Sequence, residues 1–107
     1  MLCRREVTGE GGGRVFDRVL RRMQALIRAS EYVFTLHGHE EMEADGLTVY
    51  DVEHVVLSGR IVERQRDQRT NDWKYLVEGE TLEGDAAVVV GKIGPTRKLV
   101  VLTVYAL

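Results

Sequence analysis

The stretch that decides the fold runs from Tyr32 to Gly59 and reads YVFTLHGHEEMEADGLTVYDVEHVVLSG. It begins with aromatic and β-branched residues, Tyr32–Leu36, which predict a short strand or an extended entry. His37–Asp45 predicts a brief helix with Met42 facing inward. Gly46 ends this helix, because glycine readily adopts the left-handed backbone found at helix C-termini. The stretch also contains all three histidines of the chain.

The second half of the stretch predicts another helix, with clear signals at both ends. Thr48 is suited to be the N-cap, and Asp51 three residues later completes a variant of the capping box. Leu47 and Val52 occupy the two positions of a hydrophobic staple. Gly59 supplies the stop. The helical repeat is made by Val49, Val52, Val55 and Val56. Because valine has a low helix propensity, this helix must be held by packing against a sheet.

On the N-terminal side, a stripe of apolar residues predicts an amphipathic helix of about three turns. The stripe consists of Phe16, Val19, Leu20, Met23, Leu26 and Ile27. Four arginines lie off the stripe: Arg18, Arg21, Arg22 and Arg28. They form either a solvated helix face or a surface that follows phosphates or an acidic partner. Residues 1–13 are dense in glycine, which predicts a flexible tail that includes Cys3.

On the C-terminal side, the pattern changes to β-structure. Strands are expected over residues 60–66, 73–77, 85–92 and 98–105, with turn-rich connections between them. Because these connections are short and sequential, the sheet is expected to be an antiparallel meander of about four strands. The helices would pack on one face of this sheet. Residues 14–107 therefore predict a single α+β domain.

Composition places the chain among ordinary globular proteins, with 107 residues, 44% of them hydrophobic and 30% charged. No apolar run approaches the roughly 20 residues that cross a bilayer, and a lone cysteine forms no internal disulfide, so we expect no membrane contact and a cytoplasmic protein. The net charge of −2 conceals a segregation: residues 1–30 hold seven arginines against three acids, and residues 31–58 hold seven acids and no Lys or Arg. Plain nucleic-acid binders are usually basic overall, whereas this acidic segment suits a basic partner.

A metal site is the first chemistry to consider, because His37, His39 and Glu43 lie close together in sequence. Two histidines and a carboxylate suit a metal ion. Their spacing fits no established signature, however, and the extended and helical geometries that would join them exclude each other. We therefore expect no metal and no cofactor.

Metal-independent RNA cleavage requires an acid or base and cations that hold the phosphate. The candidates are His37 as acid or base, Lys74 for the phosphate and Tyr105 for orientation. Alternatives are a capping or core role for His37 and a buried ring for Tyr105. Three further cations, Arg60, Arg64 and Arg66, share a parity along their strand, so we expect them to line one face and bind RNA phosphates. The alternative is the solvated, charge-protected outer face of an edge strand.

Short motifs in a fixed order connect these residues. They are Thr35-Leu36-His37, Met42, Gly46-Leu47-Thr48, Asp51-Val52, Gly59-Arg60-Ile61-Val62-Glu63, Tyr75-Leu76-Val77-Glu78-Gly79 and Thr103-Val104-Tyr105. In this order they resemble the domain-of-unknown-function 4258 family, which is thought to be related to the BrnT and RelE toxins, small bacterial ribonucleases of toxin–antitoxin pairs. The resemblance implies a RelE/barnase-like α+β fold, metal-independent endoribonuclease activity and an antitoxin partner.

The resemblance also bears on individual residues. It places His37 at the family's motif histidine, Tyr105 at its closing tyrosine and Lys74 where a basic residue is common. The family typically has arginines at positions that are Glu41 and Asp45 here.

Two hypotheses follow from the sequence. The first is a toxin-like endoribonuclease of a toxin–antitoxin pair. The second is a non-catalytic module of the same fold, whose acidic surface in residues 31–58, with Glu40, Glu41 and Asp45, docks a basic partner or a second copy of the chain as a homodimer.

Overall fold

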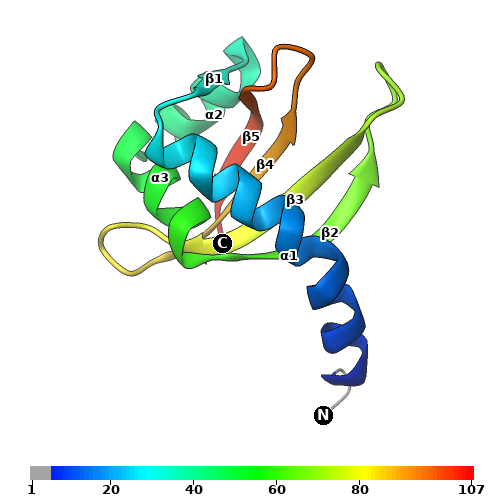
Figure 1. Cartoon of the computed structure of the whole chain (residues 1–107). Coiled ribbons are helices and arrows are strands. Elements are labelled where there is room, and N and C mark those ends of the chain that lie inside the picture. Colours follow the sequence, from blue (N-terminus) through cyan, green and yellow to red (C-terminus); the bar gives the residue numbers. More distant parts are fainter. Residues whose placement is uncertain (1–5) are drawn as a thin grey trace.

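The computed structural model describes the backbone of residues 6–107 and the side chains from Phe16 onward. Cys3 and the start of the predicted tail lie outside the described residues. The described elements, in chain order, are α1 (Glu6–Arg28), β1 (Tyr32–Phe34), α2 (Leu36–Ala44), α3 (Val49–Ser58), β2 (Arg60–Arg66), β3 (Trp73–Glu80), β4 (Ala86–Ile93) and β5 (Leu99–Ala106) (Figure 1).

The strands form one sheet in the order β1-β5-β4-β3-β2. Strands β2 to β5 make the predicted antiparallel meander, which confirms the α+β class. The sheet has five strands and not the expected four or so, because β1 joins it parallel to β5. In this pairing Tyr32 lies opposite Leu99 and Phe34 opposite Val101. The local sequence gives only a weak indication of this pairing, because β1 has three residues and its partner strand is distant in sequence.

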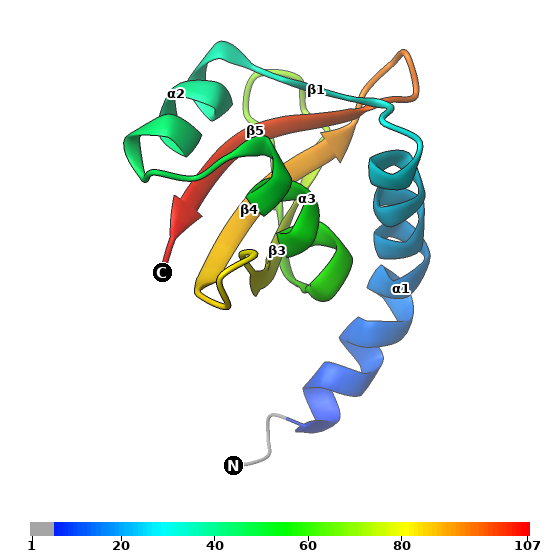
Figure 2. The same ribbon diagram turned by 90° about the vertical axis from the view of Figure 1, so that its left-hand side faces the viewer.

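The helices cover one face of the sheet (Figure 2). Met23 and Ile27 of α1 are buried in the core, which confirms the predicted apolar stripe. Met42 of α2 joins the same core, as expected. The remaining core residues come from α3 and from the helix-facing side of the sheet: Val52, Val55, Val56, Ile61, Val77, Ala87, Val89, Leu99, Val101 and Val104. Helix α1 begins at Glu6 and so includes residues 6–13 of the predicted tail, whose flexibility stays a prediction.

Helix α3 begins where the sequence predicts it. The Thr48 hydroxyl accepts a hydrogen bond from the Asp51 amide at 3.2 Å, and the Asp51 carboxylate accepts one from the Thr48 amide at 2.9 Å. The capping box is thus complete. Asp51 also accepts a hydrogen bond from the Leu82 amide at 3.1 Å, which ties α3 to the turn between β3 and β4. Chiefly through the bond from Thr48, these contacts hold the pKa of Asp51 below its ordinary value.

The end of α3 lies unusually close to the sheet, at two glycines. A Cβ atom at Gly59 would lie 2.5 Å from the carbonyl oxygens of Val55 and Glu78. A Cβ atom at Gly79 would approach the Val55 oxygen still more closely and would lie 3.0 Å from the Ser58 hydroxyl. Backbone atoms cannot move aside as a flexible side chain can. The close packing of α3 against β2 and β3 therefore depends on the absence of side chains at both positions.

We expect Gly79→Ala to lower the free energy of unfolding by about 1–3 kcal/mol, because the added methyl group forces α3 away from β3. Chemical denaturation of the purified protein measures the effect. Glu80→Ala is the matched control, since it introduces the same residue at the exposed end of the same strand. Equal stability of Gly79→Ala and the wild type would contradict the close approach described here.

Candidate nucleic-acid interface

A cleft of about 530 Å³ lies between α1 and the adjoining ends of β3 and β4. Helix α1 contributes Arg18 and Arg22, which are one helical turn apart and both exposed. The sheet contributes the rings of Trp73 and Tyr75. Among the residues whose side chains the structure describes, the lining consists of Arg18, Val19, Arg22, Asp72, Trp73, Tyr75, Ile93, Gly94 and Pro95. The cleft therefore combines aromatic surface with cationic groups.

Strand β2 brings two further arginines to this cleft. Arg64 lies opposite Tyr75 and Arg66 opposite Trp73 in the antiparallel pairing with β3. Residues directly opposite one another project from the same face of a sheet, so both arginines project on the side of α1. Their guanidinium carbons lie 3.9 and 4.2 Å from the centroid of the Trp73 ring. These distances are typical of cation–π interactions, which hold the two positively charged groups against the indole.

Arg60 is placed differently from its two neighbours on β2. The pairing of β2 with β3 shifts register between Ile61 and Glu63. A bulge of this kind adds one residue and reverses the alternation of side chains beyond it. Arg60 therefore projects from the face opposite to that of Arg64 and Arg66. The expectation that all three line one face is wrong for Arg60, because simple alternation does not foresee a bulge.

The loop between β2 and β3 is fastened by a lysine. Lys92 of β4 is 9% exposed, and its ammonium group lies 3.0 Å from the Asp67 carboxylate and 2.9 Å from the Thr70 hydroxyl. It also lies 3.7 Å from Asp72, an acid that lines the cleft, and so offsets part of that negative charge. The hydrogen bond from Lys92 is the main reason that the pKa of Asp67 lies below its ordinary value.

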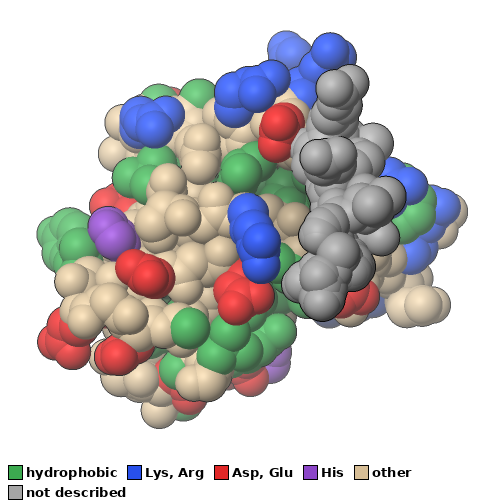
Figure 3. Space-filling model, turned by 90° about the horizontal axis from the view of Figure 1, so that it is seen from below, with side chains coloured by type: hydrophobic (Ala, Val, Ile, Leu, Met, Phe, Trp, Pro, Cys, Tyr) green, Lys and Arg blue, Asp and Glu red, His purple; other side chains and the backbone are tan. Residues whose placement is uncertain are grey.

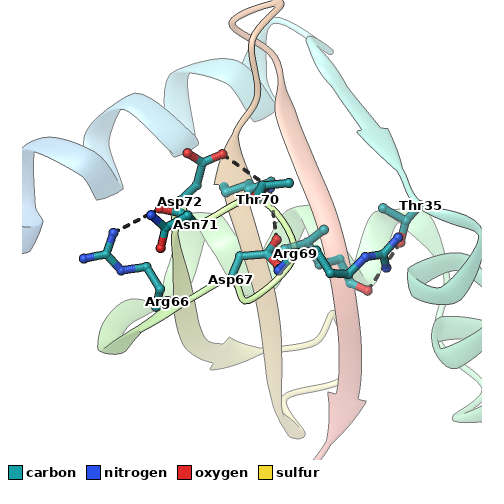
Figure 4. A network of polar contacts seen from close by, with 9 residues as sticks. Thr35, Arg66, Asp67, Arg69, Thr70, Asn71 and Asp72 are labelled. Atoms are coloured by element: carbon teal, nitrogen blue, oxygen red, sulfur yellow. Dashed lines mark hydrogen bonds and ion pairs between the residues drawn. The ribbon is translucent and has the colours of Figure 1, made fainter.

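The same loop fixes Arg66. Its guanidinium donates a hydrogen bond to the carbonyl of Asn71 at 3.0 Å (Figure 4). Figure 4 also shows Asp67, Thr70 and Asp72 in the loop beside this contact. Trp73 follows directly after Asp72 as the first residue of β3. The polar network thus holds the loop that joins Arg66 to Trp73.

His37 lies in the first turn of α2. The Thr35 hydroxyl caps this helix by accepting a hydrogen bond from the Gly38 amide at 3.0 Å. The His37 side chain is 65% exposed, and its Nε2 lies 3.6 Å from the Glu41 carboxylate on the same helix. His37 does not line the cleft.

Lys74 and Tyr105 project from the sheet face opposite to the helices. Lys74 stands between Trp73 and Tyr75 on β3, so its side chain points away from the cleft. Tyr105 lies opposite Val88, which lies opposite Glu78. Glu78 is four residues from Lys74 along β3, or about 13 Å. His37, Lys74 and Tyr105 therefore do not meet at one point in the structure.

The acids predicted to dock a partner lie on or beside α2. Glu40 is exposed, and Glu41 faces His37. Asp45 has a structural contact as well, because its carboxylate accepts a hydrogen bond from the Ala106 amide at 2.8 Å and so ties the end of α2 to β5.

Among residues 16–107, whose side chains the structure describes, no group of three or more His, Cys, Asp or Glu side chains is arranged to hold a metal ion. In the same part of the chain, no helix combines the length and the apolar character needed to cross a membrane.

The sequence alone gives little indication of the cleft. In it, Arg18 and Arg22 are two of four arginines on a helix face, and Trp73 is simply the first residue of a strand. One feature of the sequence does point to the site. The turn before Trp73 predicts that the strand beginning at this residue pairs with the preceding strand, which is rich in arginine. The antiparallel register then decides which arginines reach it.

Comparisons with known proteins identify a family. A protein-family profile described as a domain of unknown function (DUF4258) matches residues 34–106. No curated protein and no solved structure matched the chain in these comparisons. The matched range contains Arg64, Arg66 and Trp73, whereas α1, with Arg18 and Arg22, precedes it.

Removing the loop lysine is expected to change how the protein responds to acid. The lowered pKa of Asp67 stabilises the fold above about pH 4, and this contribution is lost as the pH falls through the folded-state pKa. In Lys92→Met the main cause of the lowered pKa is gone. The Asp67 carboxyl should therefore titrate closer to its ordinary pKa in NMR, and the melting temperature should fall less between pH 7 and pH 3.

Lys98→Met is the matched control, because Lys98 is an exposed lysine in the turn between β4 and β5. It should leave both the Asp67 titration and the acid sensitivity unchanged. An Asp67 titration that is identical in Lys92→Met and the wild type would show that the ammonium group does not hold this carboxylate.

Proposed function

The chain belongs to the DUF4258 family of domains of unknown function, and within that family we propose that it binds single-stranded RNA in the cleft between α1 and β3. The observation that carries the proposal is the placement of the Arg64 and Arg66 guanidinium groups against the Trp73 ring. Sites for single-stranded nucleic acids combine aromatic rings, on which bases stack, with cations that follow the phosphates.

The dimensions of the cleft favour an unpaired strand. Its volume of about 530 Å³ is within the range of small-ligand pockets, which suits one or two nucleotides rather than a duplex. Trp73 is 37% exposed beside the guanidinium groups of Arg64 and Arg66, so a base stacks on the indole where these groups leave it free, or on the guanidinium planes themselves. Either contact requires a base that is free of its own pairing partner. Arg18 and Arg22 stand on the opposite wall, where they can neutralise the backbone of the same strand.

The choice of RNA rests on the relation that is thought to exist between the DUF4258 family, which the sequence motifs resemble, and the BrnT and RelE toxins. A toxin-like endoribonuclease would add cleavage to binding. Cleavage needs an acid–base group beside the bound phosphate. His37, Lys74 and Tyr105 do not gather at the cleft, so binding is the function that the geometry supports best.

We expect Trp73→Ala to weaken the binding of a fluorescein-labelled oligouridylate by about tenfold or more, because one stacked base contributes about 1–3 kcal/mol. Fluorescence anisotropy at low salt measures the dissociation constant. Arg60→Ala is the matched control: it removes the same kind of charge from the same strand, but on the opposite face of the sheet. Its affinity should stay within about twofold of the wild type.

The arginines of α1 are tested through the salt dependence. For single strands, each phosphate contact contributes about 0.7 to the slope of log affinity against log salt, so Arg18→Ala/Arg22→Ala should reduce the slope by about 1.4. Equal weakening by Trp73→Ala and Arg60→Ala would contradict a site in the cleft. Cleavage is followed on the same oligonucleotide by gel electrophoresis, with His37→Ala as the variant that would abolish it if the first hypothesis holds.

A further inference from the structure

A second surface differs from the cleft in both chemistry and position. Two large hydrophobic side chains, Tyr50 of α3 and Leu82 of the turn between β3 and β4, are 68% and 60% exposed. Leu107, after β5, is 67% exposed. Hydrophobic residues that are exposed singly need no explanation, but a group of them marks an interaction site.

Three hydrogen bonds bring the segments that carry these residues to one end of the molecule. The Leu82 amide donates to the carboxylate of Asp51, which follows Tyr50 directly, so the turn lies against the start of α3. The Leu107 amide donates to the Ala86 carbonyl at 3.0 Å, which places the end of β5 beside the same turn. The bond from the Ala106 amide to Asp45 adds the connection between α2 and α3 to this end.

The surroundings of these side chains are acidic. The segments that meet here carry Glu43, Asp45, Asp51, Glu80, Glu83 and Asp85. No Lys or Arg occurs in residues 43–58, 75–91 or 99–107, but Arg60 of β2 lines a pocket with Glu80 and Ala86 at this end of the molecule. Figure 3 shows the face that lies at the bottom of Figure 1: acidic and hydrophobic side chains share its left and lower parts, while Lys and Arg side chains lie along its upper margin and right side and at one place near its centre. We name the surface around Tyr50, Leu82 and Leu107 the acidic apolar surface.

We propose that the acidic apolar surface docks a cationic amphipathic segment of a partner protein. Its negative field repels nucleic acids and anionic lipid surfaces and attracts positive charge. Charge complementarity of this kind accelerates the encounter and selects the partner. The exposed Tyr50 ring and the side chains of Leu82 and Leu107 require apolar side chains on the partner, which a simple polyamine lacks. The occupant that satisfies both conditions is a peptide segment with Lys or Arg on one side and Leu or similar residues on the other.

This surface is independent of the RNA cleft. Arg64, Arg66 and Trp73 lie at the far end of β2 and the start of β3, whereas Leu82 follows the end of β3. One chain therefore offers a cationic surface for an anionic polymer and an anionic surface for a cationic protein segment. Failure of either proposal leaves the other untouched, because no residue is shared between them.

The test uses a designed peptide of alternating Leu and Lys blocks, labelled with fluorescein, and the full chain. Wild-type protein should bind it saturably, and binding should weaken as salt is raised. Tyr50→Ser/Leu82→Ser should weaken the affinity by about tenfold or more, as expected for the loss of central apolar anchors. Glu83→Lys/Asp85→Lys should weaken it by a similar factor, because like charges then face the peptide.

Matched controls place the same changes elsewhere on the molecule. Leu36→Ser removes a leucine that is 75% exposed at the start of α2, and Glu63→Lys reverses an exposed acid on β2. Both should keep the affinity within about twofold of the wild type. Circular dichroism checks that every variant is folded.

Three results would overturn the proposal. The first is an absence of binding by the wild type, and the second is equal weakening by the surface variants and their controls. The third is self-association of the wild type in light scattering that Tyr50→Ser/Leu82→Ser removes, which would assign the surface to a second copy of the chain instead.

Discussion

The register shift between Ile61 and Glu63 is the constraint on which the candidate site depends. Ile61 is buried in the core on the helix side of the sheet. With strict alternation, the residues that share its face would be Glu63 and Gln65, and the arginines would point the other way. The extra residue of the bulge lets β2 bury Ile61 and still direct Arg64 and Arg66 toward α1. Bulges often re-aim side chains beside functional sites in this way.

The consequence is a separation of charge that the net value of −2 conceals. Positive groups from α1 and β2 converge on Trp73, while acids from α2, α3 and the turn between β3 and β4 occupy another end of the molecule. Polar contacts keep the two regions fixed: the part-buried Lys92 holds the loop before Trp73, and Asp51 holds the turn that carries Leu82. A polarised molecule of this kind can attract an anionic and a cationic partner at separate places.

Much of the fold could be predicted from the sequence, because its signals are local. The capping box of Thr48 and Asp51 and the stripe through Met23 and Ile27 depend on residues within one or two helical turns. The parallel pairing of β1 with β5, the bulge in β2 and the contacts of Trp73 depend on partners that are distant in sequence. The candidate site was predicted only in part for the same reason: Arg64 and Arg66 could be named, but neither their ring partner nor the opposite wall of the cleft could.

The most direct measurement of the central claim uses the fluorescence of Trp73, the single tryptophan of the chain. A base that stacks on its indole should quench the emission, and the quenching should follow the same saturation curve as the binding of an unlabelled oligouridylate. Raising the salt concentration should shift both curves together. The account predicts this coincidence. If RNA binds, as shown by an independent mobility-shift assay, while the emission of Trp73 does not change, the RNA lies elsewhere and the cleft is not its site.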